Sequence, residues 1–296
     1  MYNQFQKRQV NEYCKIHQPN GTQLPVNQLI LHETRKVAFC YVPKSACTTF
    51  KILILHTQGL LPDRLLDYDN HKQPHVIRQV RKTLLKTLAF AEREDVVREY
   101  FKFVMFRHPL ERLLSAYRNK MRMAMNRGGE TTDEYKRDIQ SEIFLYAKRS
   151  IIRHSYPEEY RKWEAAHESY PVNITFSDFI NYWLHSDKLS HNPHFNPVVR
   201  LCRPCLVRYD YYGNFKTFEK DANLLMDKIG ATESELRPQY PESSEKLVGE
   251  YYGQLNESQK INTVKKLAPE LELYYMLFPP EQDSHKKMLG INVDID

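Results

Sequence analysis

The stretch KVAFCYVPKSACTTFKILILHTQG, residues 36–59, decides the fold class. Apolar and polar side chains alternate from Leu29, and the apolar run KVAFCYV follows. The two parts together predict one strand over residues 29–42, which ends at Pro43. The residues from Thr48 onward predict a helix that ends at Gly59. A strand, a polar loop and a helix in this order are typical of an α/β protein.

The same order recurs in FKFVMFRHPLERLLSAYR, residues 101–118. The apolar run 101–106 predicts a second buried strand, and Pro109 suits the first position of the helix that follows. In an open α/β sheet, ligands bind beyond the carboxyl ends of the strands. We therefore expect the two polar loops to carry the functional site.

The rest of the chain continues the alternation of strands and helices. Helices are predicted over residues 76–100 and 219–229, and another is predicted to begin with Ser177 as its N-cap. Residues 206–213 predict a further strand. The pattern predicts an α/β fold with a central, mainly parallel sheet flanked by helices.

The composition is that of a folded globular protein. The 296 residues are 41% hydrophobic, so we expect one large domain with a real core. No run approaches the roughly eighteen apolar residues that span a bilayer, and the N-terminus lacks the apolar core of a secretory signal. The chain is expected to be either a cytosolic protein or a lumenal domain whose anchor lies outside this sequence.

Basic residues exceed acidic residues by 43 to 37, and the formal net charge is +6. The excess is concentrated in three runs, each of which is also consistent with the solvated face of a helix. Their number favours a polyanionic partner. The runs are Arg78, Arg81, Lys82 and Lys86; Arg118, Lys120, Arg122 and Arg127; and Lys148, Arg149 and Arg153.

Five cysteines and three N-glycosylation sequons do not by themselves decide the compartment. The sequons begin at Asn20, Asn173 and Asn256, and such three-residue patterns also arise by chance. Cys202 and Cys205 form a CxxC pair, but a zinc site needs two more ligands, and the sequence has no second CxxC or suitably spaced histidine pair. No metal is expected.

The loop after the first strand has the chemistry of an anion site. A strand-to-helix turn directs backbone N–H groups and the positive end of the helix at one point. Lys44 adds a charge, and Thr48 and Thr49 add hydroxyl donors. The physics is that of a nucleotide phosphate loop, although the usual pattern is missing, because glycines are absent and the lysine comes early.

The loop after the second strand adds an arginine and a serine. Arg107 leaves the strand just before the helix begins, and Ser115 lies almost two turns into that helix, so both could face one phosphate group. Taken singly, the arginine is consistent with a surface charge and the serine with an ordinary helix residue. The two loops in this order give the stronger indication of a phosphate ligand.

The two loops resemble the 5′-phosphosulfate-binding and 3′-phosphate-binding motifs of the Golgi carbohydrate sulfotransferases of chondroitin 4-O-, dermatan 4-O- and HNK-1 type. The resemblance extends from about Leu29 to about Leu277 and includes HNPHFNPVVRLCRPCLVRYDYYGNFKTFEKDANLL, residues 191–225. It implies a type II Golgi membrane protein with its catalytic domain in the Golgi lumen and its membrane anchor absent from this chain.

The resemblance also implies a fold and a division of the chain. The fold would be the P-loop-like sulfotransferase fold, with the catalytic domain over residues 29–280. Residues 1–28 would be a stem remnant or extension, and residues 281–296 a C-terminal tail. The oligomeric state stays open.

The family uses 3′-phosphoadenosine 5′-phosphosulfate (PAPS) as its sulfuryl donor and releases adenosine 3′,5′-bisphosphate, so the resemblance implies the same ligands here. Arg107 and Ser115 would hold the 3′-phosphate, which distinguishes PAPS from ATP. Phe195 departs from the pattern, since the chondroitin enzymes usually have tryptophan after the histidine. This departure affects the inference about the acceptor more than the inference about the donor. The residues that would wrap the 5′-phosphosulfate are Lys44, Ser45, Ala46, Cys47, Thr48 and Thr49.

Sulfuryl transfer needs charge stabilisation on the departing phosphate and a base for the hydroxyl proton. Lys44 is expected to supply the charge. His194 is the first candidate for the base, because it lies in the segment that resembles the family's His-aromatic element, although it is also consistent with positioning the acceptor or capping a loop. His191, His75 and Glu111 are the alternatives.

The acceptor implied by the resemblance and the basic runs is an anionic glycosaminoglycan, with the 4-hydroxyl of GalNAc in chondroitin as the leading case. Dermatan, terminal GalNAc and glucuronate acceptors stay open. A P-loop kinase would need phosphate-loop glycines and magnesium-binding acids, which are not evident. A non-catalytic heparin-binding or nucleic-acid-binding protein would explain the basic runs but not the two ordered loops, so no nucleic-acid partner is expected.

In an oxidising lumen the CxxC cysteines are expected to form disulfides. Cys202 and Cys205 could bond to one another, or one of them could bond to Cys14. The odd number of cysteines predicts at least one free thiol, and Cys47 in the first loop is the leading candidate.

Overall fold

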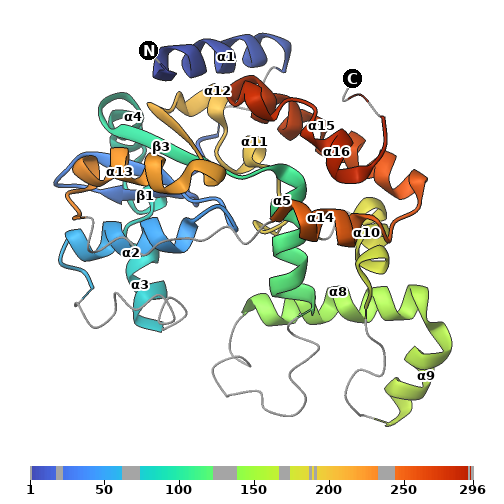
Figure 1. Ribbon diagram of the computed structural model, residues 1–296. Coiled ribbons are helices and arrows are strands. Elements are labelled where there is room, and N and C mark those ends of the chain that lie inside the picture. Colours follow the sequence, from blue (N-terminus) through green and yellow to red (C-terminus); the bar gives the residue numbers. More distant parts are fainter. Residues whose placement is uncertain are drawn as a thin grey trace. The chain divides into compact units, whose positions relative to one another are not determined.

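The chain forms two compact units, each assembled from separated segments (Figure 1). The computed structural model describes residues 2–17, 23–61, 74–122, 139–166, 174–186, 189, 192–232, 244–292 and 294. Unit 1 comprises Met1–Pro109, Pro197–Glu242 and Pro269–Gln282, and unit 2 comprises Leu110–Asn196, Ser243–Ala268 and Asp283–Asp296. These units do not follow the boundaries expected at residues 28 and 280, and the division into stem, catalytic domain and tail stays a prediction.

Unit 1 is built on a four-stranded sheet in the order β1-β2-β3-β4. Strands β2, β3 and β4 run parallel, and β1 pairs antiparallel with β2. This mostly parallel sheet, flanked by helices, confirms the predicted α/β fold class. The strands are β1 (Leu29–His32), β2 (Val37–Cys40), β3 (Phe101–Phe106) and β4 (Tyr211–Asn214). The helices are α1 (Tyr2–Ile16), α2 (Cys47–Thr57), α3 (Pro74–Lys82), α4 (Phe90–Glu99), α11 (Val198–Leu201), α12 (Pro204–Val207) and α13 (Phe218–Ile229), with 3₁₀ turns η3 (Leu85–Thr87), η6 (Phe215–Thr217) and η8 (Pro279–Glu281).

Residues 29–42, predicted as one strand, form the hairpin β1–β2. The register pairs Leu29 with Cys40, and the polar residues 33–36 make the turn, in which Lys36 takes a left-handed φ of 49°. Alternation predicts extended backbone but does not say where it reverses. Every residue of both strands is buried, so this hairpin belongs to the core of unit 1.

The core of unit 1 contains an aromatic cluster between the sheet and the helices α2 and α13. Phe39 of β2 stacks on Phe103 of β3 with ring centroids 4.7 Å apart, and Phe50 of α2 meets Phe103 edge-on at 5.1 Å. Phe218 of α13 completes the cluster at 6.0 Å from Phe50. Each such pair contributes about 0.5–1.5 kcal/mol beyond the area it buries. The cluster therefore fixes α2, and with it the loop that precedes α2, against the sheet.

Residues 76–100, predicted as one helix, are divided into α3, the turn η3 and α4. Between them, the carbonyl of Thr83 accepts a hydrogen bond from the Leu31 backbone N–H at 2.8 Å, and Leu84 forms an isolated antiparallel bridge with Ile30. Pairing with the outer strand β1 thus replaces helical hydrogen bonds at this point. Such a tertiary interaction is not visible in the local pattern.

Unit 2 is helical. Its helix α10 begins with Thr175 as the N-cap, not with Ser177 as predicted, because the Thr175 hydroxyl accepts from the Asp178 backbone N–H at 3.2 Å while the Asp178 carboxylate accepts from the Thr175 N–H at 2.9 Å. The helices are α5 (Pro109–Ala116), whose first residue belongs to unit 1, the π-helix η4 (Tyr117–Arg122), α8 (Ile139–Ser155), α9 (Pro157–Ala166), α10 (Phe176–His185), α14 (Ser244–Tyr252), α15 (Glu257–Leu277), which continues into unit 1, and α16 (Ser284–Leu289).

One of the three expected N-glycosylation sequons can be placed on these elements. Asn256 is exposed and caps α15, with its side-chain oxygen accepting from the Gln259 N–H at 2.9 Å. The asparagines of the other two sequons, Asn20 and Asn173, lie outside the described residues. Within the described ranges, no helix combines the length and the apolar character that crossing a bilayer requires.

Candidate active site

Three strand ends meet at one edge of the sheet in unit 1. The register places Cys40 of β2 beside Val104 of β3, and Phe106 at the end of β3 beside Asn214 at the end of β4. Because β2, β3 and β4 are parallel, the chain leaves all three at the same edge. The loop after β2, residues 41–46, and the loop after β3 are therefore neighbours, as expected for an α/β binding site.

The backbone of the β2–α2 loop (residues 41–46) adopts a conformation that non-glycine residues rarely take. Lys44 has a φ of 71° and Ala46 a φ of 56°, whereas Ser45 between them is not in the left-handed region. Each left-handed residue costs about 1–2 kcal/mol, because its Cβ crowds the following carbonyl. Alternation of this kind turns successive N–H groups toward one side and makes an anion-binding concavity. The strain at the two positions that flank Ser45 points to a function for the loop.

The first turn of α2 adds backbone donors to this loop. Helix α2 begins at Cys47, and its N-cap residue Ala46 makes no side-chain hydrogen bond to the first turn. The N–H groups of a first helical turn have no partners inside the helix, and the helix dipole is positive there. Thr48 is half-buried and Thr49 is buried on the same turn. The turn is suited to a phosphate or sulfate group.

Ser45 provides a direct test of whether a ligand fits this loop. The side chain is fully buried, and its hydroxyl has no hydrogen-bond partner among the described residues. A buried hydroxyl without a partner costs about 1–3 kcal/mol, so native proteins rarely keep one without a reason. An oxygen of a bound phosphosulfate group would satisfy it. The residues present therefore fit the 5′-phosphosulfate of PAPS.

Arg107 joins the loop after β3 to the β2–α2 loop. Its guanidinium Nη1 donates to the backbone carbonyl of Lys44 at 3.3 Å, and its Cζ lies 4.6 Å from the ring centroid of Phe215. These contacts hold a half-buried arginine against the loop that carries Lys44. The structure thus brings two of the predicted site residues together within unit 1.

Lys51 on α2 is a second cation beside the β2–α2 loop, and the sequence pattern gave it no role. Its ammonium lies 3.6 Å from the ring centroid of Tyr41, and burial lowers the pKa of Lys51, although Cys47 opposes that shift. Burial also raises the pKa of Tyr41 to about 12, so this phenol stays protonated and donates to the Asn27 carbonyl at 3.0 Å. The sequence did contain one indication of a role for Lys51, because it is the single lysine in an otherwise apolar helical run.

Ser115 and His194 both belong to unit 2. Ser115 is half-buried on α5, in the second turn as predicted. His194 is half-buried in the irregular segment before α11. Two of the alternative bases, His191 and the side chain of His75, lie outside the described residues. Glu111 is half-buried on the first turn of α5.

The ring of His194 is oriented by Asn192. The Asn192 side-chain oxygen accepts from the His194 backbone N–H at 3.0 Å, which identifies it as the oxygen of the amide, and it lies 3.0 Å from His194 Nδ1. An amide oxygen only accepts, so Nδ1 carries the hydrogen and Nε2 is the nitrogen with the basic lone pair whenever the ring is neutral.

The backbone of the same segment is held by a buried arginine. Arg112 of α5 donates from Nη1 to the carbonyl of His194 at 3.3 Å and from Nη2 to the carbonyl of Asn196 at 3.0 Å. A planar guanidinium that bonds two carbonyls restricts the turn around the histidine. The local pattern of the sequence gives Arg112 no such role, because it reads only as a charge on an amphipathic helix.

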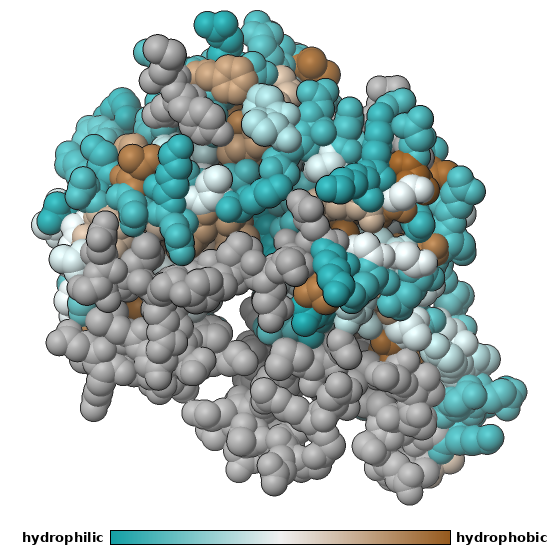
Figure 2. Space-filling view, in the orientation of Figure 1, coloured by the Kyte–Doolittle hydropathy of each residue, from teal (hydrophilic) through white to brown (hydrophobic). Residues whose placement is uncertain are grey.

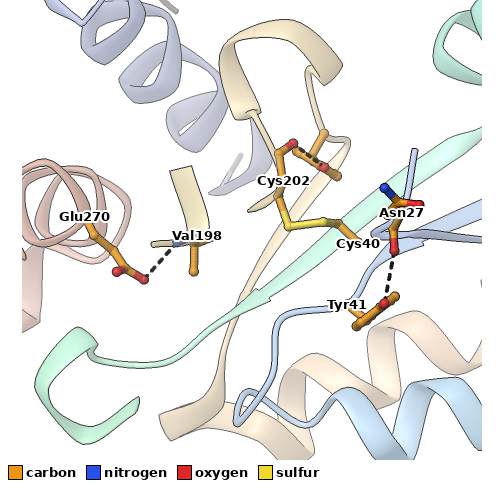
Figure 3. Close-up of a disulfide and its surroundings, with 7 residues drawn as sticks. Asn27, Cys40, Tyr41, Val198, Cys202 and Glu270 are labelled. Atoms are coloured by element: carbon orange, nitrogen blue, oxygen red, sulfur yellow. Dashed lines mark hydrogen bonds between the residues drawn. A yellow bond between two sulfur atoms is a disulfide. The ribbon is translucent and has the colours of Figure 1, made fainter. Parts of the chain in front are cut away.

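Two disulfides join the CxxC segment to helix α1 and to strand β2 within unit 1. Cys14 of α1 bonds to Cys205 of α12, with Cα atoms 5.5 Å apart, and Cys40 of β2 bonds to Cys202, with Cα atoms 5.9 Å apart (Figure 3). The bond to Cys14 was one of the expected alternatives and is confirmed. The alternative of a bond within the CxxC pair is wrong, because Cys205 is bonded to Cys14 and Cys202 to Cys40. Cys47 is a free thiol, as predicted.

The region around the second disulfide shows how the β2–α2 loop is anchored. Figure 3 places the Cys40–Cys202 bond beside the hydrogen bond from Tyr41 to Asn27. Cys40 is the last residue of β2, so the disulfide fixes the strand end from which the loop departs. No group of three or more His, Cys, Asp or Glu side chains suited to a metal ion occurs in the described part of the chain.

A strained loop, an uncapped helix start and a lysine–arginine pair at the carboxyl edge of an α/β sheet are features suited to a phosphorylated ligand. Comparison with known families narrows this class. The chain belongs to the sulfotransferase family, which it matches over residues 27–275.

Curated relatives place the chain among similar proteins. It is 28% identical to carbohydrate sulfotransferase 14 of Danio rerio over 86% of this chain and 62% of the relative. It is 30% identical to carbohydrate sulfotransferase 14 of Homo sapiens over 74% of this chain and 55% of the relative. For carbohydrate sulfotransferase 11 of Danio rerio the identity is 27%, over 96% of this chain and 78% of the relative. The chain thus spans less than two thirds of the length of the first two. No solved structure matches it.

Proposed function

We propose that this chain is a PAPS-dependent carbohydrate O-sulfotransferase, which transfers a sulfuryl group from PAPS to a sugar hydroxyl. The observation that carries the proposal is the β2–α2 loop, where the buried, unpartnered Ser45 hydroxyl sits between two left-handed residues next to an uncapped helix start. Family membership and the carbohydrate sulfotransferase relatives support the same conclusion.

In this mechanism the first loop binds the 5′-phosphosulfate and stabilises the leaving group. A new S–O bond forms to the sugar oxygen while the S–O bond to the 5′-phosphate breaks, and the bonding electrons stay on that phosphate. Lys44 and the N–H groups of the first turn of α2 neutralise the charge that develops there. Arg107 and Ser115 are assigned to the 3′-phosphate.

His194 is assigned as the general base. The sugar hydroxyl must lose its proton as it attacks sulfur, and Nε2 of His194 has the lone pair to take it because Nδ1–H is bonded to Asn192. Arg112 would act as a positioning residue through the His194 backbone carbonyl.

We infer that the acceptor is an anionic glycosaminoglycan, with the 4-hydroxyl of GalNAc in chondroitin as the first candidate and dermatan, terminal GalNAc or glucuronate as alternatives. The net charge of +6 supports an anionic acceptor. The two disulfides support an oxidising compartment, and we propose the Golgi lumen, with attachment to the membrane through an anchor outside this chain.

The function is tested by incubating the protein with radiolabelled PAPS and a panel of desulfated glycans, followed by identification of the labelled position. Label on a chondroitin hydroxyl would establish both reaction and acceptor. Binding of adenosine 3′,5′-bisphosphate should be tight without Mg²⁺, which separates this enzyme from a kinase. A protein that binds the bisphosphate but labels only neutral N-glycans would contradict the inferred acceptor.

Replacing Arg107 with alanine is expected to weaken binding of adenosine 3′,5′-bisphosphate by about 10- to 100-fold, because a charge-assisted hydrogen bond contributes about 1.5–3 kcal/mol. Ser115→Ala should weaken it several-fold, since a neutral hydrogen bond contributes less. Titration calorimetry with the bisphosphate and with adenosine 5′-monophosphate measures both effects. Arg98→Ala on the exposed face of α4 is the matched control. Unchanged bisphosphate affinity in both site variants would sink the 3′-phosphate assignment.

Lys44→Ala is expected to reduce kcat by about 10²–10³-fold and to change donor affinity much less, because its charge acts mainly on the leaving phosphate in the transition state. Alanine keeps a Cβ at this left-handed position, so the loop strain is the same in both proteins. Steady-state kinetics at varied PAPS concentration separate kcat from KM. A defect confined to KM would make Lys44 a binding residue only.

A further inference from the structure

A second polar site lies on unit 1, between helices α1 and α12. It is a cavity of about 620 Å³, here called the α1–α12 groove, and it shares no residue with the β2–α2 loop. In Figure 1 the two helices lie side by side above the sheet, and Figure 2 shows mostly hydrophilic side chains over that part of the surface. The groove is lined by Gln4, Lys7, Arg8, Asn11, Glu12, Cys14, Lys15, Pro204, Cys205 and Arg208.

The lining is strongly basic. Four cationic side chains face one carboxylate, that of Glu12. Lys15 pairs with Glu12 at 2.8 Å and Lys7 with Asp210 at 2.9 Å, but these pairs are solvent-exposed, so an incoming anion can replace them at little cost. Arg8 and Arg208 are exposed, and no ion pair within the described residues engages either of them. The groove therefore offers charge to an anionic partner.

The shape of the basic stripe favours an extended partner over a compact ion. The lining residues of α1 fall on one helix face, because they occupy positions i, i+3, i+4, i+7 and i+11; they are Gln4, Lys7, Arg8, Asn11 and Lys15. At 1.5 Å per residue this stripe runs for about 16 Å, much longer than a single phosphate. The two amides can exchange hydrogen bonds with hydroxyl groups between the charges.

The chemistry of the lining favours a glycan over a nucleic acid. None of the lining residues is aromatic, so the groove offers no surface on which bases could stack. The Cys14–Cys205 disulfide crosses the groove and joins its two walls. It also indicates an oxidising compartment, where sulfated and carboxylated glycans are present and nucleic acids are scarce.

The groove is also preorganised. The disulfide limits movement of α1 against α12, and Arg208 leaves α12 with a left-handed φ of 49°, which fixes where its side chain begins. A site whose walls are held before binding loses less conformational freedom when the ligand arrives.

We propose that the α1–α12 groove binds a chain of sulfated or carboxylated sugars. That this chain is an extension of the acceptor glycan rests on the proposed function, whereas the binding itself does not. The site would hold the polymer through Arg8, Arg208, Lys7 and Lys15 while the reaction takes place elsewhere.

The test is binding of a size-defined chondroitin sulfate oligosaccharide by calorimetry at several salt concentrations. The double variant Arg8→Ala/Arg208→Ala should bind at least tenfold more weakly at low salt, with the slope of log K against log salt shallower by about one to two. The control Arg98→Ala/Lys220→Ala removes two exposed charges that lie outside the groove and the basic runs of the same unit, and it should bind like the wild type. Both variants should retain wild-type bisphosphate affinity and thermal stability.

Equal weakening by the two double variants would overturn the proposal, because it would show a response to net charge alone. Preference of the groove for single-stranded DNA over the oligosaccharide would overturn it as well. Failure of the proposed function gives a different result. A protein that loses oligosaccharide binding only in the groove variant, yet never binds the bisphosphate, would retain the groove site and lose the sulfotransferase assignment.

Discussion

His194→Ala is expected to lower turnover by about 10²–10⁴-fold while leaving bisphosphate affinity unchanged. The variant removes the group assigned to accept the hydroxyl proton, whereas the donor phosphates are assigned to other residues. A base must be neutral to act, so the wild-type rate should rise with pH through the range in which histidines titrate, and the residual rate of the variant should lack that rise. Steady-state kinetics of both proteins between about pH 5 and 8 measure the pH dependence of the two rates.

Asn192 and His191 supply the controls for this assignment. Asn192→Ala should reduce kcat by a smaller factor, because the ring remains but its Nδ1 hydrogen no longer has its acceptor. His191→Ala should leave the rate near that of the wild type. If His194→Ala binds the donor normally and keeps near-wild-type turnover, the base is His191, His75 or a carboxylate instead.

The second large effect concerns the two disulfides, which are nested. The Cys14–Cys205 bond closes a loop of 191 residues, and the Cys40–Cys202 bond closes a loop of 162 residues inside it. The two loop lengths differ by about 30 residues. While one bond is present, the other closes a loop of only about 30 residues, which corresponds to about 3.5 kcal/mol in the chain-entropy description. Once one is lost, the remaining bond closes the full span and is worth about 5 kcal/mol.

Replacement of one pair of cysteines by alanine should therefore lower the free energy of unfolding by about 3–4 kcal/mol, and replacement of both pairs by about 9 kcal/mol. The second value is comparable to the whole stability of a typical domain. Urea unfolding of the three variants measures these losses, with Cys47→Ala as a control that should change little. Two single losses that add up to the double loss would contradict the nested description.

The sequence alone was sufficient for the fold class and for the two strand–loop–helix segments. The apolar run of β3 and the strand–loop–helix pattern around Lys44 are local signals, and the parallel sheet confirms what they predict. The reversal between β1 and β2 and the division of residues 76–100 were missed, since both depend on pairing between segments. Local patterns report periodicity but not partners.

The candidate site was predictable by residue type but not by arrangement. The motif resemblance named Arg107 and His194, yet the contact of Arg107 with the Lys44 carbonyl and the bond from His194 to Asn192 required coordinates. The buried Ser45 hydroxyl without a hydrogen-bond partner also required coordinates, because burial depends on the residues packed around it. Cys40 as partner of Cys202 was also missed, because a cysteine inside a strand reads as an ordinary core residue.

The pairing of the cysteines also constrains how the protein is made. The two native bonds join cysteines that are 191 and 162 residues apart. Cys14, Cys40 and Cys47 therefore leave the ribosome before Cys202 and Cys205 are made. At ordinary synthesis rates Cys202 follows Cys40 by roughly 10–30 s, long enough for the early thiols to oxidise with one another. Any bond formed in that interval is non-native and must be exchanged by attack of a thiolate before the sheet can close. Wherever such early bonds form, a disulfide-exchange catalyst is expected to speed maturation.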